Sequence, residues 1–547
     1  GQYSVMNMDT RQSKNYWIGA QSLYGNEIPN LVLRFQRVSP MEVSPHDPEV
    51  LYYGSNKVHR TRDLGVNWET ISPDLTWNPP HSQRASGWPI TRDVTGEEVY
   101  STLYAIRESL HEPGVIWVGS NDGLFHITRD NGVNWTDITP PDLPEGGRVQ
   151  FLEPSPHRPG SAYYAVHRFL LGDYAPYIYR TDDYGASWTL LTDGTNGIPG
   201  DWPTRVVRED PDREGLLYGG TEFGLFISFD NGANWQSFQR NLPNVPVADI
   251  KVFRKDLIVA TQGRSFWILD NLSALHQITP QTASTDVFLY EPRDGYRTRD
   301  GAAFVGPTIE YYLASAPAGP VTIDILDSAG ELVNSFESRR APAGQPAARP
   351  ANTPEAMMMA GRGGQRFGGM RAAQVTAFEG HNRFVWNVQH ESGLGAPPGQ
   401  YQVRLTVGNR TLEKPLTVLI DPRLAEEGLT AEDLQEQFRH NMTMRTMVEE
   451  VNALVDRVRS AQEQLEGATG REARIAQGLA EVADKLITGP IRYSAPGLQT
   501  HISYLAGMTR RVDQKVGRDA FERYEVLRAE LDEITAEVDR LMGFRGR

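Results

Sequence analysis

The octapeptide TRDNGVNW at residues 128–135 decides the fold, because three near-copies of it occur in the same half of the chain. They are TRDLGVNW (61–68), TDDYGASW (181–188) and SFDNGANW (228–235), and we call all four the boxes. Each box begins with a hydroxyl residue and keeps Asp third, Gly fifth and Trp last. This pattern predicts a tight hairpin turn in which the Asp carboxylate accepts backbone N–H bonds and Gly takes a positive φ.

The box aspartates are therefore expected to serve their own turns and not a reaction. These structural aspartates are Asp63, Asp130, Asp183 and Asp230. The boxes follow one another at intervals of 67, 53 and 47 residues, which suits a four-stranded propeller blade with variable loops. Apolar strand pairs such as VIWVGSNDGLFHIT precede each box. We predict about five blades between Arg34 and Leu272, with residues 1–33 left over from an earlier blade.

The composition excludes several classes of function. The 547 residues include 54 basic and 69 acidic residues, and this net charge of -15 argues against a broad nucleic-acid surface. The chain has no cysteine, which excludes disulfides, thiolate metal sites and a cysteine nucleophile. No apolar run approaches the ~20 residues that span a bilayer, and the start GQYSVMNMDT has no signal-peptide pattern. Because this start lacks Met, we expect a processed product or part of a longer protein.

The boxes and their flanks resemble the Asp-box, or BNR, repeats of sialidase-like and sortilin-like propellers. Longer phrases, such as PSPHRPGSAYYAV and TQGRSFWILDN, are similar to large secreted bacterial proteins labelled glycosyl hydrolase or sortilin-like BNR-repeat proteins. This resemblance implies a fold and not a reaction. It also implies an extracytoplasmic location, which is periplasmic, cell-surface or secreted. In that group a propeller region precedes a segment like this one, so the chain would be the C-terminal half.

Two further domains are predicted after the propeller, which we place at residues 1–280. Residues 281–422 alternate apolar and polar positions in short runs, a pattern typical of a β-sandwich, and they resemble an immunoglobulin-like module. An insertion at about 338–375 is rich in Pro, Ala, Gly and Arg and is expected to be disordered. Residues 423–547 carry apolar residues at helical spacing and predict a bundle of four amphipathic helices. The predicted fold class is mainly β, followed by this bundle.

A functional site is expected at the blade ends opposite the boxes. There the second-to-third hairpins of the blades meet the blade connections, of which residues 76–100 are the longest. A glycosidase needs two carboxyl groups about 5 to 9.5 Å apart, one of them with a raised pKa. The catalytic candidates are Asp93, Glu222 and Asp122. The ligand-binding candidates are Trp88, Arg92, Glu97, Glu98 and Arg264.

The sequence contains no motif that settles the chemistry. It has no G-x-S-x-G elbow, no H-E-x-x-H and no P-loop, and its arginines lie in no motif diagnostic of the sialidase triad. It therefore predicts no cofactor and no metal. Three functions stay open: a glycan-active enzyme of the glycoside hydrolase type, a propeller that binds a carbohydrate or a peptide, and a structural subunit of an extracellular assembly or homo-oligomer.

The predicted blades are too few to close a ring. An open ring of about five blades would expose apolar blade faces to water. We therefore expect the missing blades to come from an N-terminal propeller region or from a partner chain.

Overall fold

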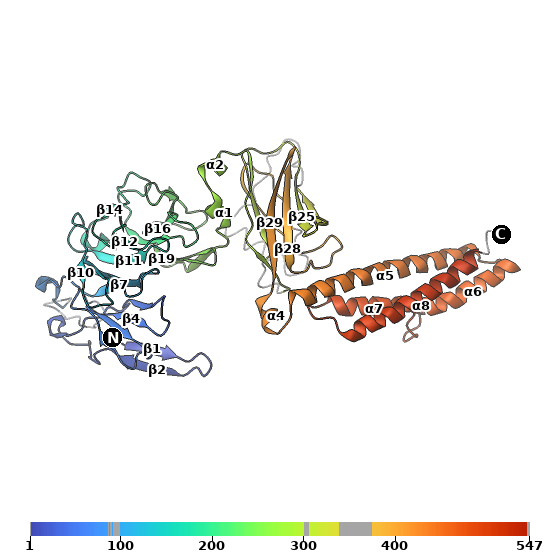
Figure 1. Cartoon of the computed structure of the whole chain (residues 1–547), viewed down its shortest axis with the longest axis horizontal. Coiled ribbons are helices and arrows are strands. Elements are labelled where there is room, and N and C mark those ends of the chain that lie inside the picture. The colour runs from blue at the N-terminus through green and yellow to red at the C-terminus, as the bar shows by residue number, and fades with distance from the viewer. Residues whose placement is uncertain are drawn as a thin grey trace. The chain divides into compact units, whose positions relative to one another are not determined.

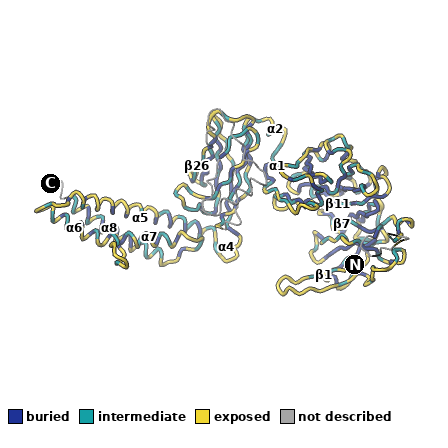
Figure 2. Tube along the Cα trace, turned by 180° about the vertical axis from the view of Figure 1, so that it is seen from behind, coloured by how far each residue is buried: buried dark blue, intermediate teal, exposed yellow. Residues whose placement is uncertain are grey.

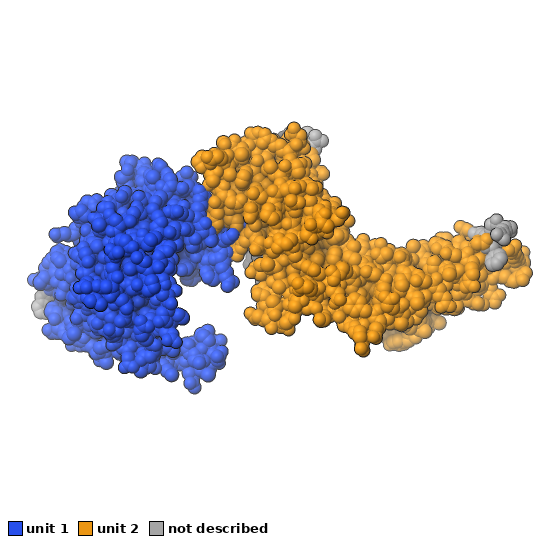
Figure 3. Space-filling view, in the orientation of Figure 1, with its two compact units in different colours: residues 1–272 blue, residues 273–547 orange. Residues whose placement is uncertain are grey.

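The structure, a computed structural model, describes residues 2–85, 87, 90, 94, 99–299, 306–338 and 375–543. The chain divides into two compact units, residues 1–272 and 273–547 (Figure 3). The first unit is built of β-sheets, and the second contains β-sheets followed by helices. The chain is thus mainly β, as the sequence predicts. The insertion predicted at about 338–375 lies, except for its two end residues, outside the described residues.

Five antiparallel sheets follow one another along the first unit as propeller blades (Figure 1). The first blade is β3 (Met41–Val43), β4 (Leu51–Gly54), β5 (Val58–Thr61) and β6 (Glu69–Thr70), and the second is β7 (Leu103–Glu108), β8 (Ile116–Ser120), β9 (Phe125–Thr128) and β10 (Thr136–Asp137). The third is β11 (Arg148–Pro154), β12 (Ala162–His167), β13 (Tyr177–Thr181) and β14 (Thr189–Leu190). The fourth is β15 (Thr204–Glu209), β16 (Leu217–Thr221), β17 (Leu225–Ser228) and β18 (Gln236–Ser237), and the fifth has only β19 (Val247–Phe253), β20 (Asp256–Thr261) and β21 (Phe266–Leu269).

Neighbouring blades pack through a small residue in the second strand. A Cβ atom on Gly220 of β16 would lie 2.7 Å from Cγ1 of Val247 in β19, and one on Gly119 of β8 would overlap Val149 in β11. A larger side chain at these glycines would therefore force two blades apart. Strand residues around them are buried between the blades, while the connections are mostly exposed (Figure 2).

Each box forms the hairpin between the third and fourth strands of its blade. In the second blade Oδ1 of Asp130 accepts hydrogen bonds from Thr128 Oγ1 at 2.9 Å and from the backbone N–H of Asn134 at 2.8 Å, and Oδ2 accepts from Asn134 Nδ2 at 2.6 Å. These bonds, with the one from the Asn134 backbone the largest cause, hold the pKa of Asp130 below its ordinary value. Gly132 has φ 93°, which a side chain would strain. The same contacts recur at Asp63, Asp183 and Asp230.

The Trp residues of three boxes bond to the preceding blade. The indole Nε1 of Trp135 donates to the carbonyl of Ile71 at 2.8 Å, and Nε1 of Trp188 donates to Ile138 at 2.7 Å. Nε1 of Trp235 donates to Leu191 at 3.1 Å. Each acceptor directly follows the fourth strand of the blade before. A box therefore closes its own turn and also joins two blades.

A hairpin of β1 (Gln2–Met6) and β2 (Ser13–Trp17) comes before the first blade and pairs with no further strand in the described part of the chain. Most of this hairpin is exposed (Figure 2). The ring of Tyr3 nevertheless packs edge-on against Trp68, with 5.6 Å between the centroids. Ile18, which follows β2, is buried in one cluster with Phe35 and Tyr53.

The second unit begins with two short helices, α1 (Ser273–Gln277) and α2 (Pro280–Ala283), and continues with two sheets. One sheet contains β22 (Val287–Leu289), β24 (Thr308–Leu313) and β27 (Gly380–Val385). The other contains β23 (Gly295–Arg297), β25 (Val321–Asp327), β26 (Leu332–Glu337), β28 (Gly399–Val407) and β29 (Arg410–Ile420). Buried residues of both sheets, such as Tyr311 and Val403, form one apolar core. The two sheets therefore pack face to face.

Helices complete the second unit. They are α4 (Pro422–Glu426), α5 (Ala431–Gln464), α6 (Arg471–Leu486), α7 (Leu498–Arg510) and α8 (Arg518–Gly543). Thr430 caps α5, since its hydroxyl accepts the backbone N–H of Asp433 at 3.1 Å. The four longer helices share an apolar core that includes Val451, Ile502 and Leu531. No helix in the described part of the chain is long and apolar enough to cross a membrane.

A buried ion pair joins the helices to the sheets of the second unit. Asp513, between α7 and α8, accepts hydrogen bonds from Arg297 Nη2 at 2.6 Å and Arg297 Nε at 3.2 Å. Arg299 Nε donates to the same carboxylate at 2.6 Å. The other side of the Arg297 guanidinium donates to the carbonyls of Gly395 and Ala396 at 2.9 and 2.7 Å.

Candidate functional site

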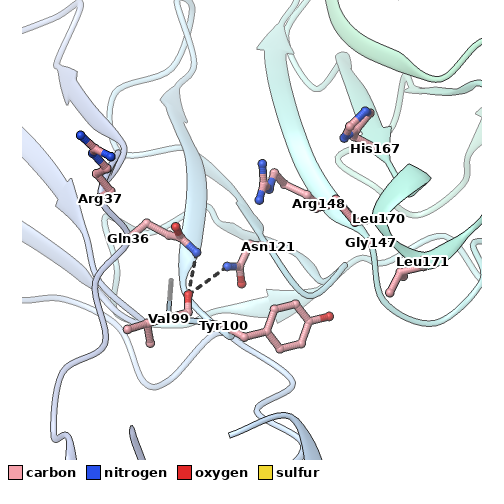
Figure 4. A pocket seen from close by; sticks show the side chains of 10 residues that line it. All are labelled: Gln36, Arg37, Val99, Tyr100, Asn121, Gly147, Arg148, His167, Leu170 and Leu171. Carbon is pink, nitrogen blue, oxygen red and sulfur yellow. Dashed lines mark hydrogen bonds between the residues drawn. The ribbon is translucent and has the colours of Figure 1, made fainter. Parts of the chain in front are cut away.

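A cavity of about 450 Å³ lies at the blade ends opposite the boxes (Figure 4). Residues before or at the starts of three successive innermost strands line it: Gln36 and Arg37 precede β3, Val99 and Tyr100 precede β7, and Arg148 opens β11. Asn121, Leu170 and Leu171 come from second-to-third connections, while Gly147 precedes β11 and His167 ends β12. This is the end at which the blade topology predicts a site.

The described end of the longest connection forms one wall of the cavity. Gln36 Nε2 and Asn121 Nδ2 both donate to the carbonyl of Val99, at 2.6 and 3.3 Å (Figure 4). Oδ1 of Asn121 accepts the backbone N–H of Thr102 at 2.9 Å. These bonds hold the chain before β7 against both its own blade and the one before, so this wall is fixed by polar contacts.

Arg148 gives the cavity a positive charge. Its guanidinium carbon lies 4.7 Å from the ring centroid of Tyr104, a cation–π distance. Among the described residues no carboxylate pairs with Arg148, and its buried Nε has no hydrogen-bond partner there. Leu170 and Leu171, from the short helix η3 (Phe169–Leu171), are exposed aliphatic side chains on the same cavity. The site thus combines two arginines, Arg37 and Arg148, with an apolar wall.

A histidine and a glutamate connect the cavity to the fourth blade. His167, the last residue of β12, has its Nε2 at 2.7 Å from Glu222 Oε1, and Arg205 Nε donates to the same oxygen at 2.6 Å. Burial lowers the pKa of His167 and outweighs the opposing effect of Glu222. Burial also raises the pKa of Glu222, but the hydrogen bonds from His167 and Arg205 outweigh it, so the net shift is downward. Glu222 is therefore an ionised acceptor and His167 a neutral donor through Nε2.

The sequence-predicted site residues lie in different surroundings. Glu222 contacts the cavity-lining His167, as above. Asp122 is buried in the β8–β9 turn, where it accepts hydrogen bonds from Ser120 Oγ at 2.5 Å and from the backbone N–H of Asn78 at 3.1 Å. Arg264 is exposed in the β20–β21 connection and does not line the cavity. Trp88, Arg92, Asp93, Glu97 and Glu98 lie outside the described residues.

Sequence reasoning missed Arg148, His167 and the leucine pair at 170–171. A signal for Arg148 was present, because it follows Gly146 and Gly147 at the start of a predicted innermost strand, where blade connections enter the site. His167 ends an apolar run and reads as a strand residue. Nothing in its neighbours indicates that Glu222, 55 residues away, becomes its partner.

No protein-family model and no curated protein matches the chain. Among solved structures, it is similar to the GH74 xyloglucanase from Xanthomonas campestris, with 15% identity and a TM-score of 0.36 over 74% of this chain and 53% of that one. It is also similar to YCF48 bound to D1 peptide, with 15% identity and a TM-score of 0.30 over 51% and 75% of the two chains. A third is PorZ, a surface component of the type-IX secretion system of Porphyromonas gingivalis, with 14% identity and a TM-score of 0.29 over 69% and 51%. All three likenesses are distant, and the chain spans about half the length of the xyloglucanase.

Proposed function

We propose that the chain is an extracytoplasmic binding propeller that takes an acidic peptide segment into the cavity around Arg148. The observation that carries this proposal is an arginine with no carboxylate partner among the described residues, set beside exposed leucines. Partly buried guanidinium groups cost solvation free energy unless an anion or acceptor compensates them. A carboxylate of a ligand supplies that compensation and accepts two parallel N–H bonds.

The apolar wall favours a peptide over a sugar. Leu170 and Leu171 offer an aliphatic surface to which an apolar side chain next to the acid can pack. Sugar rings are held mainly by aromatic platforms, and Tyr100 alone of the described lining residues is aromatic apart from His167. The net charge of -15 repels acidic ligands from the rest of the surface, which concentrates their binding at a basic cavity.

Of the predicted catalytic carboxylates that the structure describes, neither Glu222 nor Asp122 suits the general acid of a glycosidase. A glycosidase acid needs a raised pKa, whereas the pKa of Glu222 is lowered. Both oxygens of Asp122 are engaged within its own turn and by Asn78. The catalytic alternative therefore rests on Asp93, which lies outside the described residues.

The proposal includes three domains, with the propeller at residues 1–280, an immunoglobulin-like sandwich at 281–422 and a helical bundle at 423–547. The two sheets that share one core and the four longer helices that share another support the latter two. In an extracytoplasmic protein such modules serve as docking elements beside the binding propeller.

Binding of defined peptides tests this function. Isothermal titration would compare an acetylated, amidated Leu-Leu-Glu-Leu peptide with its Leu-Leu-Gln-Leu counterpart, using wild type, Arg148→Ala and Arg148→Lys. We expect wild type to prefer the acidic peptide by about tenfold or more, and Arg148→Ala to abolish that preference. Arg148→Lys keeps the positive charge but loses the two parallel N–H donors of the guanidinium group, so it should retain part of the preference for the acidic peptide. Arg264→Ala is the matched control, because Arg264 is exposed and lies away from the cavity.

Two outcomes would contradict the proposal. One is equal affinity of the wild type for the acidic and amide peptides, or an equal loss of affinity for the acidic peptide in Arg148→Ala and Arg264→Ala. The other is turnover of a polysaccharide panel that disappears in Asp93→Asn with binding retained, which would establish the hydrolase instead.

A further inference from the structure

Arg148 and His167 stand directly opposite each other in the third blade. Arg148 opens β11, His167 ends β12, and the two residues are partners in the antiparallel register of these strands. Side chains of opposed residues leave a sheet on the same face, with about 4.5–5.5 Å between their Cβ atoms. Both residues line the cavity (Figure 4). A ligand group that bonds to Arg148 is therefore within reach of the His167 imidazole.

One ring nitrogen of His167 is satisfied by the described part of the chain, and the other is not. Nε2 donates to Glu222 Oε1 at 2.7 Å, and Arg205 Nε donates to the same oxygen at 2.6 Å. Nδ1 is buried and has no hydrogen-bond partner among the described residues. The His167 side chain is 1% exposed, so bulk water does not compensate this nitrogen. Because Glu222 fixes one proton at Nε2, a second proton on the ring enters at Nδ1.

The surroundings of His167 oppose this second proton. Burial is the largest cause of its lowered pKa; the hydrogen bond to Glu222 acts against burial, and the positive charges of Arg205 and Arg148 act with it. Like charges directly opposite each other destabilise an antiparallel pair. The ring of Phe169, with its centroid 4.5 Å from that of His167, carries no charge and no acceptor for an N–H.

Several titratable or charged groups lie on the elements around His167. Those on the strands packed against β12 and on the β16–β17 connection are Arg148, Tyr177, Arg205 and Glu222, and the cavity adds Arg37 and Tyr100. Tyr177 donates its hydroxyl to Asp173 at 2.9 Å. Glu222 is thus the anion that bonds to the imidazole, and it bonds to Nε2.

A carboxylate bound to Arg148 reverses this balance. Its negative charge offsets the guanidinium charge opposite the imidazole, and an opposite charge within about 4–6 Å raises the pKa of a histidine. One carboxylate has enough lone pairs to accept from the guanidinium and from Nδ1–H together. Charge-assisted hydrogen bonds of this kind are about twice as strong as neutral ones.

We propose that His167 is a second anion-binding residue of the cavity, which takes up a proton from solvent as a ligand carboxylate binds to Arg148 and donates Nδ1–H to that carboxylate. This inference rests on the carboxylate ligand of the proposed function. Glu222 and Arg205 act through His167 as positioning residues, because Glu222 fixes the proton at Nε2 and Arg205 keeps Glu222 ionised. The site therefore binds carboxylates more tightly in mildly acidic than in alkaline surroundings.

The direction of the pH dependence follows from the linkage between proton and ligand. Above the pKa of His167 in the complex no proton is taken up, and the affinity is lowest. As the pH falls toward the pKa of His167 without ligand, which lies below 6.5, the affinity rises by up to about tenfold per pH unit. A glutamate on the ligand has an ordinary pKa of about 4.3 and stays ionised above pH ~5.5.

Titration calorimetry with the acetylated, amidated Leu-Leu-Glu-Leu peptide tests the inference. For wild type we expect Kd to be about tenfold lower at pH ~6 than at pH ~8, with uptake of about half a proton or more at pH ~6.5 in buffers of different ionisation enthalpy. His167→Gln cannot titrate, so its Kd should change less than about twofold over the same range. His157→Gln is the matched control and should keep the wild-type pH dependence. His157 lies in the connection between β11 and β12, where its Nε2 is 2.7 Å from the carbonyl of Asp210, and it does not line the cavity.

An NMR titration of the histidine rings makes the test independent of the peptide. Acetate is the probe, and we expect it to raise the pKa of His167 by about one unit in wild type but not in Arg148→Ala, with His157 unchanged in both. If the peptide does not bind but acetate gives this shift, the inference stands and the peptide assignment fails.

Three results would overturn the inference. The first is peptide binding without proton uptake, which leaves the proposed function standing. The second is an affinity that falls on acidification in wild type but not in His167→Gln, which would make Nδ1 an acceptor for a ligand N–H. The third is a pKa of His167 that neither the peptide nor acetate raises.

Discussion

Replacement of Asp513 by Asn tests whether the buried ion pair holds the helices of the second unit to its sheets. Asp513 has 2% and Arg297 8% of its side-chain surface exposed, so neither charge is solvated by water. The variant keeps the shape of the side chain and one acceptor oxygen. It removes the negative charge that faces both Arg297 and Arg299.

The expected loss follows from this geometry. Breaking a buried ion pair by removing one partner costs about 3–5 kcal/mol, because the other charge stays buried without compensation. The asparagine oxygen and the carbonyls of Gly395 and Ala396 still accept from Arg297, which places the loss at the lower end. We therefore expect the free energy of unfolding of the second unit to fall by about 3 kcal/mol.

The chain offers a matched control. Asp286 and Arg410 also lie in the second unit with 2.6 Å between Oδ2 and Nη2, but their side chains are 73% and 52% exposed. Asp286→Asn should cost less than ~1 kcal/mol, since exposed pairs contribute little. Urea unfolding followed at 222 nm reports mainly on the α-helices, all of which lie in the second unit among the described residues. Equal losses in the two variants, or no loss in Asp513→Asn, would refute the assignment of stability to burial of the pair.

Three more outcomes are expected. Asp230→Ala should lower the stability of the first unit by about 1 kcal/mol, because Ser228 and Asn234 lose their acceptor, and should leave peptide affinity unchanged in the same titrations. Trp188→Phe should lower the free energy of unfolding in urea by about 1 kcal/mol, because the hydrogen bond to Ile138 is lost. Trp68→Phe should cost clearly less, because the Trp68 indole has no hydrogen-bond partner among the described residues, and equal costs would contradict this difference. Burial lowers the pKa of His59 from 6.5 to about 4, so the unfolded state binds a proton first as the pH falls. Stability should be full above pH ~6.5 and drop by about 1.4 kcal/mol per pH unit between ~6.5 and 4, and pH-dependent unfolding of His59→Gln should lack this slope.

The structure of the boxes was predictable because their contacts are local. The donors to Asp130 lie within four residues of it, so a repeated octapeptide carries the whole arrangement. The hydrogen-bond partner of Trp135 is the carbonyl of Ile71, 64 residues earlier, and nothing in the octapeptide indicates this partner. The repeat predicts the blade. The contact between blades also needs a residue of the preceding blade, which the octapeptide does not contain.

The candidate site was predictable in place but not in chemistry. Blade topology indicates the end opposite the boxes, and the described lining of the cavity lies there. The acids of the longest connection were predicted as site residues because they cluster in the sequence. Arg148 and His167 come instead from single positions on two strands of one blade, and an isolated residue on a strand gives no pattern.

The repeated joint between blades has a consequence for how the first unit opens. Each blade touches only the one before and the one after, through a small residue in a second strand, and box tryptophan bonds add to the joints among the first four blades. Such a series behaves as a linear chain of coupled units in which a terminal unit has one neighbour and a central unit has two. Fraying should therefore start at β3–β6 or β19–β21 and advance inward, blade by blade. Amide protection would peak in β11–β14, so that the part of the cavity formed by Arg148 and His167 is the last to come apart.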